Sequence, residues 1–180
     1  LPGTFINFTA GLVVDDCYTS PQTFDAWIDA YLPNGQPFGG NPVFGPMLNA
    51  SADAFDKIMV TNVKSVFWLA NMVLPQMAER KDGAMIILSS IGALRGSSQL
   101  GLYGTSKAAE AGLCRALACE WGPKNIRVNC IAPGLIRTDF ARALWEDETR
   151  RKAREALTPL RRIGEPNDIR GIAVCLASEA

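Results

Sequence analysis

The sequence of 180 residues contains no histidine. This absence excludes the Ser-His-Asp and Cys-His mechanisms of hydrolases and every metal site that needs an imidazole ligand. Acid–base chemistry in this chain must therefore use other side chains.

Cysteines are few and scattered, at Cys17, Cys114, Cys119, Cys130 and Cys175. Their number is odd and no two of them have the C-x-x-C spacing, so we expect neither a disulfide framework nor a zinc site. A reducing compartment fits this pattern, and no metal site is predicted.

An excess of charge is also missing, because 18 Lys and Arg balance 18 Asp and Glu. A balanced chain has no global field that draws it to nucleic acid or to an anionic membrane surface, so neither is expected as a partner. No uninterrupted apolar run approaches the roughly 18 residues that a membrane-spanning helix needs, and the first residues lack the order of a signal peptide. We therefore expect a cytoplasmic location.

Residues 1–40 differ in pattern from the rest of the chain. Two short β-prone runs, 4–9 and 12–14, predict strands. Ser20 predicts the start of a helix that continues to Tyr31.

A Pro- and Gly-rich stretch, residues 33–40, is typical of a linker and leads into residues 41–180. The pattern there predicts, in order, helix 51–81, strand 84–88, helix 103–121, strand 126–131, helix 140–157 and a helix opened by Pro166. Uninterrupted apolar strands that alternate with helices are typical of a parallel sheet in an α/β fold, buried on both faces.

Two parallel strands do not make a stable sheet alone, because about three strands or covering helices are generally required and exposed edges are open to pairing. Three sources of cover are open: the first forty residues folding back as substitute strands, a partner subunit, or a segment of a longer parent enzyme.

The most informative pattern is Tyr103-Gly-Thr-Ser-Lys107. Residues four apart on a helix share one face, so we expect the phenol and the ammonium to lie together. A neighbouring ammonium favours the ionised form of a phenol, which makes the tyrosine a usable proton donor and acceptor. By itself this spacing is more often a half-buried tyrosine beside a solvated lysine.

Two further polar residues stand at informative places. Ser90 follows the predicted strand 84–88, at the carboxyl edge where open α/β sheets bind ligands, and its hydroxyl can bind a substrate oxygen. An isolated serine there is more often a turn residue. Asn62 lies within an apolar helical stretch, where a buried amide needs a partner, and this favours a functional role.

These residues belong to a longer series of motifs in a fixed order. The series is Asn62-Val63, the strand 85–88 with Ser89-Ser90, Tyr103-x-x-x-Lys107 with two alanines, Ile126-Arg-Val-Asn129, and Pro133-Gly134 with Thr138. Residues 41–180 thereby resemble the C-terminal catalytic part of the short-chain dehydrogenase/reductase family. The segment Glu120-Trp-Gly-Pro123 is similar to carbonyl reductases of the NADP-dependent retinal/dicarbonyl type.

The resemblance implies an oxidoreductase with a partial doubly wound, Rossmann-like parallel sheet that lacks the first β-α-β unit and the last strand. It implies NAD or NADP as the cofactor that supplies the hydride, and a small-molecule carbonyl or alcohol as the substrate. Tyr103 would be the acid/base, and Lys107 would hold the nicotinamide ribose. Ser90 would orient the substrate oxygen, and Asn62 would join a water relay to the lysine.

The resemblance also implies cofactor contacts from the residues after the last predicted strand. These residues are Pro133, Gly134, Ile136 and Thr138. Ile136 would lie near the nicotinamide carboxamide and Thr138 near the phosphates. The charged helix 140–157 would cover the substrate, although such a helix is usually only a solvated face.

The family's phosphate loop, T-G-x-x-x-G-x-G, has no counterpart in this sequence. Two hypotheses are therefore open. One is an NAD(P)-dependent reductase or alcohol dehydrogenase, and the other is a non-catalytic α/β module derived from that family. Helices corresponding to 62–77 and 103–121 build the family's dimer interface, so a homo-oligomer through these helices is expected.

Overall fold

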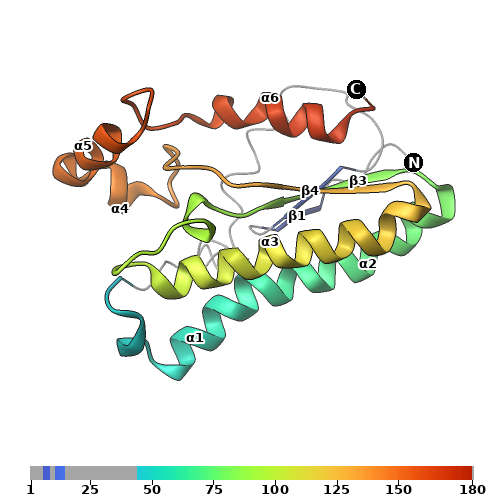
Figure 1. Ribbon diagram of the computed structural model, residues 1–180, viewed down its shortest axis with the longest axis horizontal. Coiled ribbons are helices and arrows are strands. Elements are labelled where there is room, and N and C mark those ends of the chain that lie inside the picture. The colour runs from blue at the N-terminus through green and yellow to red at the C-terminus, as the bar shows by residue number, and fades with distance from the viewer. Residues whose placement is uncertain (1–5, 9–10, 15–43, 180) are drawn as a thin grey trace.

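The computed structural model describes residues 6–8, 11–14 and 44–179 (Figure 1). The helix predicted to begin at Ser20 and the linker predicted over residues 33–40 lie outside the described residues.

A four-stranded sheet runs through the middle of the molecule. Its order is β1 (Ile6–Phe8), β2 (Gly11–Val14), β3 (Gly83–Leu88) and β4 (Ile126–Ile131). β3 and β4 are parallel, with Gly83 opposite Ile126, whereas β2 pairs antiparallel with β3, and β1 with β2. Of the three sources of cover for the edge of β3, the structure thus shows the N-terminal segment folding back as a hairpin.

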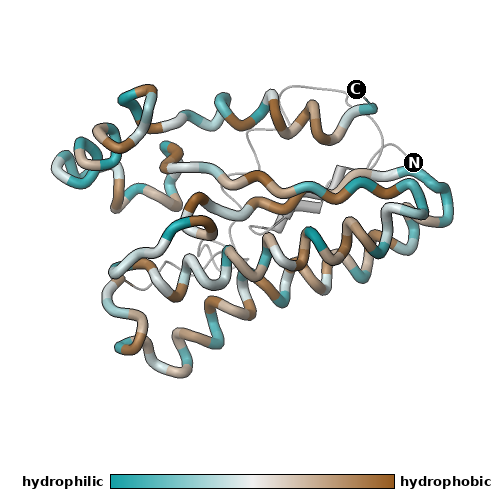
Figure 2. Tube along the Cα trace, in the orientation of Figure 1, coloured by the Kyte–Doolittle hydropathy of each residue, from teal (hydrophilic) through white to brown (hydrophobic). Residues whose placement is uncertain are grey.

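β3 is buried on both faces, as its uninterrupted apolar run predicts, and Figure 2 shows hydrophobic residues along both parallel strands. Met85 and Ile87 belong to the larger core cluster on one face. Ile86 belongs to a smaller cluster on the other face, together with Ile131 and Ala173. The strand pair is therefore the middle layer of three.

A long helical segment and α3 (Gly101–Trp121) form the layer over the larger core (Figure 1). The segment consists of α1 (Ala52–Met59), the π-helical turn η4 (Val60–Lys64) and α2 (Ser65–Arg80). Ser51 begins it by accepting a hydrogen bond from the Ala54 N–H at 3.1 Å, and Lys81, in the left-handed conformation with φ 57, ends it. The predicted long helix is confirmed, with a π turn in it that the pattern does not show.

The opposite layer contains α6 (Pro166–Ala177), with proline in the first turn as predicted (Figure 1). The prediction of one helix over residues 140–157 is wrong, because the segment is divided into α4 (Arg142–Trp145) and α5 (Glu148–Leu157). The break occurs at Asp147, whose carboxylate accepts a hydrogen bond from the Arg150 N–H at 3.0 Å and so caps a new helix.

Large apolar side chains remain exposed on the outer side of α2. Phe67, Trp68 and Met72 are 50%, 54% and 62% exposed. By length and composition, residues 52–80 form a helix that is long and apolar enough to cross a membrane, with a mean hydropathy of 1.2 over 18 residues. Polar residues such as Asn62, Lys64 and Asn71 interrupt this helix, so it reaches the limit by average composition and not by the uninterrupted apolar run that the prediction concerns. A core helix of a folded domain passes the same test, and the other face of α2 is buried in the larger core.

The start of α3 lies against the 3-10 turn η5 (Ile91–Ala93), which follows β3. A Cβ atom on Gly104 would lie 2.7 Å from the carbonyl oxygen of Gly92, which is closer than a side-chain carbon can come to a backbone oxygen. Glycine at position 104 is therefore what allows α3 to approach the end of β3.

We predict that Gly104→Ala lowers the free energy of unfolding by about 1–3 kcal/mol, because the added carbon must push η5 away from α3. Gly112→Ala on the same helix is the matched control, since a Cβ there would meet only Arg115 Nη2, at 3.8 Å. That control should raise the free energy of unfolding by about 0.5–1 kcal/mol through helix propensity. Urea unfolding measures both, and equal effects of the two substitutions would contradict the argument.

Candidate active site

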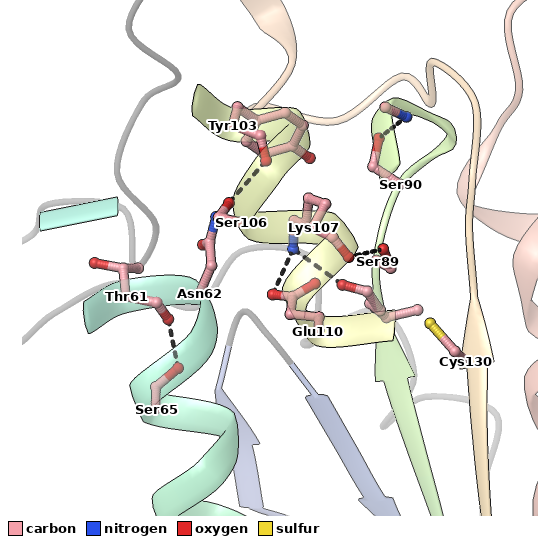
Figure 3. A network of polar contacts seen from close by, with 12 residues as sticks. Thr61, Asn62, Ser65, Ser89, Ser90, Tyr103, Ser106, Lys107, Glu110 and Cys130 are labelled. Carbon is pink, nitrogen blue, oxygen red and sulfur yellow. Dashed lines mark hydrogen bonds and ion pairs between the residues drawn. The ribbon is translucent and has the colours of Figure 1, made fainter. Parts of the chain in front are cut away.

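The buried polar side chains of the described residues form one group. They are Asn62, Ser89, Ser106, Lys107 and Glu110. The group lies where η4, the first half of α3 and the carboxyl end of β3 meet (Figure 3). Buried polar groups need partners, and here they supply them to each other. The group therefore forms a polar region at the edge of the apolar core, next to the carboxyl end of β3.

Asn62 is one end of this group and is carried by the π turn η4, a feature that often occurs at functional sites. Its Nδ2 donates a hydrogen bond to Ser106 Oγ at 2.8 Å, and Ser106 Oγ donates to the Tyr103 carbonyl oxygen at 2.8 Å. The amide has the buried partner that its apolar surroundings require. Its direct link is to Ser106 on α3 and through Ser106 to the first turn of that helix, and the water relay to Lys107 stays a prediction.

Lys107 is the centre of the group. Its Nζ donates to the Leu88 carbonyl oxygen and to Glu110 Oε1, both at 3.0 Å. The same Nζ lies 5.8 Å from the centroid of the Tyr103 ring. The ammonium therefore lies beside the tyrosine, as the spacing predicts, but two of its three N–H groups are used elsewhere. One N–H group remains for a ligand or for the phenol.

Ser89 ties α3 to the end of β3. Its Oγ donates to the Lys107 carbonyl oxygen at 2.7 Å, and its N–H donates to the Ile131 carbonyl oxygen at 2.8 Å. Both bonds come from one buried residue, so the backbone of Lys107 is fixed relative to both parallel strands.

Ser90 follows directly and lies near Tyr103. Its Oγ accepts a hydrogen bond from the Gly92 N–H at 3.0 Å, and a Cβ on Gly92 would lie 3.4 Å from that oxygen and 3.8 Å from Tyr103 Cε1. Figure 3 shows the serine hydroxyl and the phenol at the same end of the group. The Ser90 hydroxyl keeps its own proton for donation, so it can bind a substrate oxygen beside the phenol.

The loop after β4 passes close to these residues. The Ile91 N–H donates to the Pro133 carbonyl oxygen at 2.9 Å, which places Pro133 beside the turn that follows Ser90. A Cβ on Gly134 would meet no atom within 4 Å, so there is open space next to the loop. Two of the predicted cofactor-binding positions therefore adjoin the catalytic candidates.

The other two predicted cofactor-binding residues lie farther along this loop. Ile136 forms a backbone bridge with Gly164, and its Cδ1 lies so close that a Cβ on Gly164 would be 2.3 Å away. The Thr138 carbonyl oxygen accepts a hydrogen bond from Trp145 Nε1 at 2.7 Å. Thr138 is thereby tied to α4, the first part of the segment predicted to cover the substrate.

Glu110 belongs to the site, and sequence reasoning missed it. Its side chain is fully buried, and its second oxygen, Oε2, has no hydrogen-bond partner. Burial raises the pKa of Glu110 to about 8, although the attraction of Lys107 acts in the opposite direction. The signal was present in the sequence, because Ser106 and Glu110 share the helical spacing of the buried face with Leu102 and Cys114.

A pair of thiols lies under this site, between α3 and β4. A hydrogen bond with Cys114 lowers the pKa of the Cys130 thiol to about 6, and the same bond raises the pKa of Cys114. Ser89 and Lys107 also stabilise a Cys130 thiolate. The electrostatic influence of the lysine thus reaches β4.

Comparisons with known proteins agree with the fold and the motifs. A family model described as enoyl-(acyl carrier protein) reductase matches residues 34–180. Dehydrogenase/reductase SDR family member 4 of Sus scrofa is 43% identical over 139 residues, which are 77% of this chain and 50% of that protein. Human dehydrogenase/reductase SDR family member 2, mitochondrial, is 44% identical over 140 residues, 78% of this chain and 50% of that protein. The chain therefore spans about half the length of these curated relatives.

Solved structures give the same picture. A 4-hydroxyisoleucine dehydrogenase complexed with NADH is 30% identical, with a TM-score of 0.73 over 78% of this chain and 58% of that one. The protein ElxO with NADP bound is 26% identical, with a TM-score of 0.73 over 80% of this chain and 58% of that one. Since the family model covers most of the sequence and the fold agrees, the chain belongs to the short-chain dehydrogenase/reductase family.

Proposed function

We propose that the chain is the catalytic part of an NAD(P)-dependent oxidoreductase that reduces a carbonyl or oxidises an alcohol, with Tyr103 as the acid/base. The observation that carries the proposal is that the hydroxyl of Ser90 and the ring of Tyr103 approach the same place beside Gly92, since one Cβ position there would lie 3.4 Å from Ser90 Oγ and 3.8 Å from Tyr103 Cε1. The ammonium of Lys107 lies on the next turn of the same helix.

Each side chain has a distinct task in this proposal. Ser90 binds the substrate oxygen, and Tyr103 gives a proton to that oxygen in reduction or takes one in oxidation. Lys107 lies beside the phenol ring and uses its remaining N–H group to hold the nicotinamide ribose. Asn62 fixes the first turn of α3 through Ser106 and so keeps the phenol in place.

The residues present fit the nicotinamide end of NAD or NADP. Two of the three N–H groups of Lys107 have protein acceptors, and there is open space at Gly134, which follows the Pro133 that is bonded to the turn after Ser90. Ile136 and Thr138 continue the loop toward α4 and would hold the carboxamide and the phosphates. When bound, the cofactor supplies or accepts the hydride. Two structural relatives, one complexed with NADH and one with NADP bound, support this choice of cofactor.

Apolar dicarbonyl and retinal-type carbonyls are the substrates that the motifs favour, because the segment Glu120-Trp-Gly-Pro123 resembles reductases of that type. Substrate recognition would come from the segment α4–α5, which is attached to the site through the bond between Trp145 and Thr138.

Tyr103→Phe is expected to lower the turnover of a dicarbonyl with NADPH or NADH by about 10²–10⁴-fold, because the acid/base proton is lost while the ring stays. The free energy of unfolding should remain within about 0.5 kcal/mol of the wild type. Steady-state absorbance of the reduced cofactor measures turnover. Thr105→Ala is the matched control, because Thr105 is exposed on the same turn and donates only to the Gly101 carbonyl oxygen and to Met47.

Two results would overturn the proposal. One is full turnover in the Tyr103→Phe variant. The other is titration calorimetry that shows no binding of NAD or NADP to the folded wild-type chain, which would favour the non-catalytic α/β module.

A second candidate function, self-association, is favoured by the apolar face of α2. Phe67, Trp68 and Met72 are half-exposed or more on that helix, and contiguous exposed apolar area is typical of an interface. We propose that the chain forms a homo-oligomer through residues 62–77 and 103–121, where α2 and α3 lie side by side (Figure 1).

Trp68→Glu is expected to convert the oligomer into a monomer, because a carboxylate would be buried without a partner in the interface. Light scattering at micromolar concentration measures the mass. Leu157→Glu is the matched control, since Leu157 is 72% exposed at the end of α5 and lies outside the proposed interface. A monomeric wild type, or an unchanged mass in the Trp68→Glu variant, would contradict the proposal.

A further inference from the structure

Glu110 has no task in the chemistry proposed above, although its burial is costly. The side chain is 0% exposed, Oε1 accepts from Lys107 Nζ, and Oε2 has no partner. A buried polar atom without a hydrogen-bond partner destabilises the fold, so an apolar residue would fill this place at lower cost. The contact with Lys107 is the feature that sets this position apart.

The geometry of α3 places Glu110 behind the lysine as seen from the tyrosine. Side chains on a helix lean toward its N-terminus, so Lys107 leans toward Tyr103, and Glu110 leans toward Lys107. Glu110 and the Leu88 carbonyl oxygen take two N–H groups of the ammonium at 3.0 Å each, and the tyrosine ring centroid lies 5.8 Å from it. The lysine thus stands between a carboxyl group and a phenol that can use the same donor.

We propose that Glu110 is a positioning residue for Lys107: an ionised Glu110 holds the ammonium back at the end of β3, and a protonated Glu110 releases it toward Tyr103 and the nicotinamide ribose. The inference rests on the function proposed above for Tyr103 and Lys107. The step is the uptake of one proton from solvent by the carboxylate, and no other bond is made or broken.

The groups around Glu110 support a protonation change in the neutral range. Burial raises the pKa of this carboxyl to about 8, and Lys107, on the same helix, is the cation that opposes the rise. Cys130 on β4 is the titratable group that faces it from the sheet, and its negative form raises the pKa further. Ser89 on β3 and Asn62 on η4, the other buried polar residues of the group, carry no charge. The carboxyl group therefore changes from neutral to ionised as the pH rises through about 8.

The sign of the effect on stability follows from linkage. The pKa of Glu110 is higher in the folded chain than its ordinary value of 4.5, so the stability that this group contributes is fully present below about pH 4.5 and is lost as the pH rises through about 8. Glu110→Gln keeps the shape of the side chain and removes the titration. Urea unfolding of the wild type and of the Gln variant should agree at low pH, and the Gln variant should become the more stable of the two above about pH 8. A wild type that is more stable than the variant at high pH would overturn the proposal, because it would mean that the ionised pair is the favoured form.

A second measurement follows Lys107 itself, in the full chain without cofactor. The ¹⁵Nζ resonance of Lys107, assigned through Lys107→Arg, should shift with a midpoint near pH 8 in the wild type and lose that shift in Glu110→Gln. Glu120→Gln is the matched control, because Glu120 is exposed on the same helix and loses the same charge. A resonance that titrates alike in the Glu110→Gln variant and the wild type would overturn the proposal, whatever the outcome of unfolding.

The link to function is tested by calorimetric titration of NADP or NAD against pH. The wild type should lose affinity several-fold as the pH rises through about 8, whereas Glu110→Gln should keep its low-pH affinity. Equal pH dependence in the two proteins would overturn the role of Glu110. If no protein binds either dinucleotide while the Lys107 resonance still depends on Glu110, the proposed function fails and the positioning of Lys107 by Glu110 stands.

Discussion

The buried ammonium of Lys107 is the constraint on which the rest of the site depends. A charge removed from water must be paired and hydrogen-bonded, and the effective penalty for an unpaired ion is several kcal/mol. Here the pairing comes from Glu110 on the same helix and from the carbonyl oxygen of Leu88, the last residue of β3. Leu88 is the last residue of β3, so its carbonyl oxygen is a backbone acceptor at the end of the strand. The lysine therefore fastens α3 to the carboxyl end of the sheet.

The position of the tyrosine and the serine follows from this attachment. Once Lys107 and Ser89 hold α3 at the end of β3, the first turn of the helix must pass close to η5, and only a glycine at position 104 allows that approach. Ser90 and Tyr103 then approach each other beside Gly92. The relative position of the serine hydroxyl and the phenol thus depends on close backbone packing at Gly92 and Gly104 and on the hydrogen bonds of Lys107.

Much of this fold could be predicted from the sequence because its signals are local. The strands β3 and β4 appear as uninterrupted apolar runs, and the long helices appear as apolar residues at helical spacing with Ser51 and Pro166 at their starts. The spacing of Tyr103 and Lys107 is equally local. The sequence pattern does not predict features that depend on a single capping residue or on the pairing of distant strands. Asp147 capped a second helix inside a segment whose charge pattern is continuous, and the antiparallel direction of β2 depends on its partner strand.

The candidate site was predicted in its outline and missed in its buried part. Ser90, Tyr103 and Lys107 can be predicted because each belongs to a motif with a known chemical use. Ser106 and Glu110 belong to no such motif, and their importance follows from their burial on α3. From sequence alone, a polar residue on an amphipathic helix is assigned to the solvent-exposed face, and only the structure shows that it is buried against another element. Asn62 gives the clearer signal because it lies in the largely apolar helical stretch between Met59 and Phe67, and its partner in the structure is Ser106.

The proposed chemistry and the binding of a dinucleotide depend on different parts of the protein. Among the described residues, the contacts that place Ser90, Tyr103 and Lys107 come from β3, β4, α3, η4 and the turns that follow the strands. β1 and β2 extend the sheet from the other edge of β3 by backbone pairing. Affinity for a dinucleotide comes largely from its phosphates, which a glycine-rich loop at a helix N-terminus usually holds. The given sequence contains no such loop. The side chains proposed for proton transfer are held by contacts within residues 62–134, so their arrangement can be tested separately from the affinity for a dinucleotide.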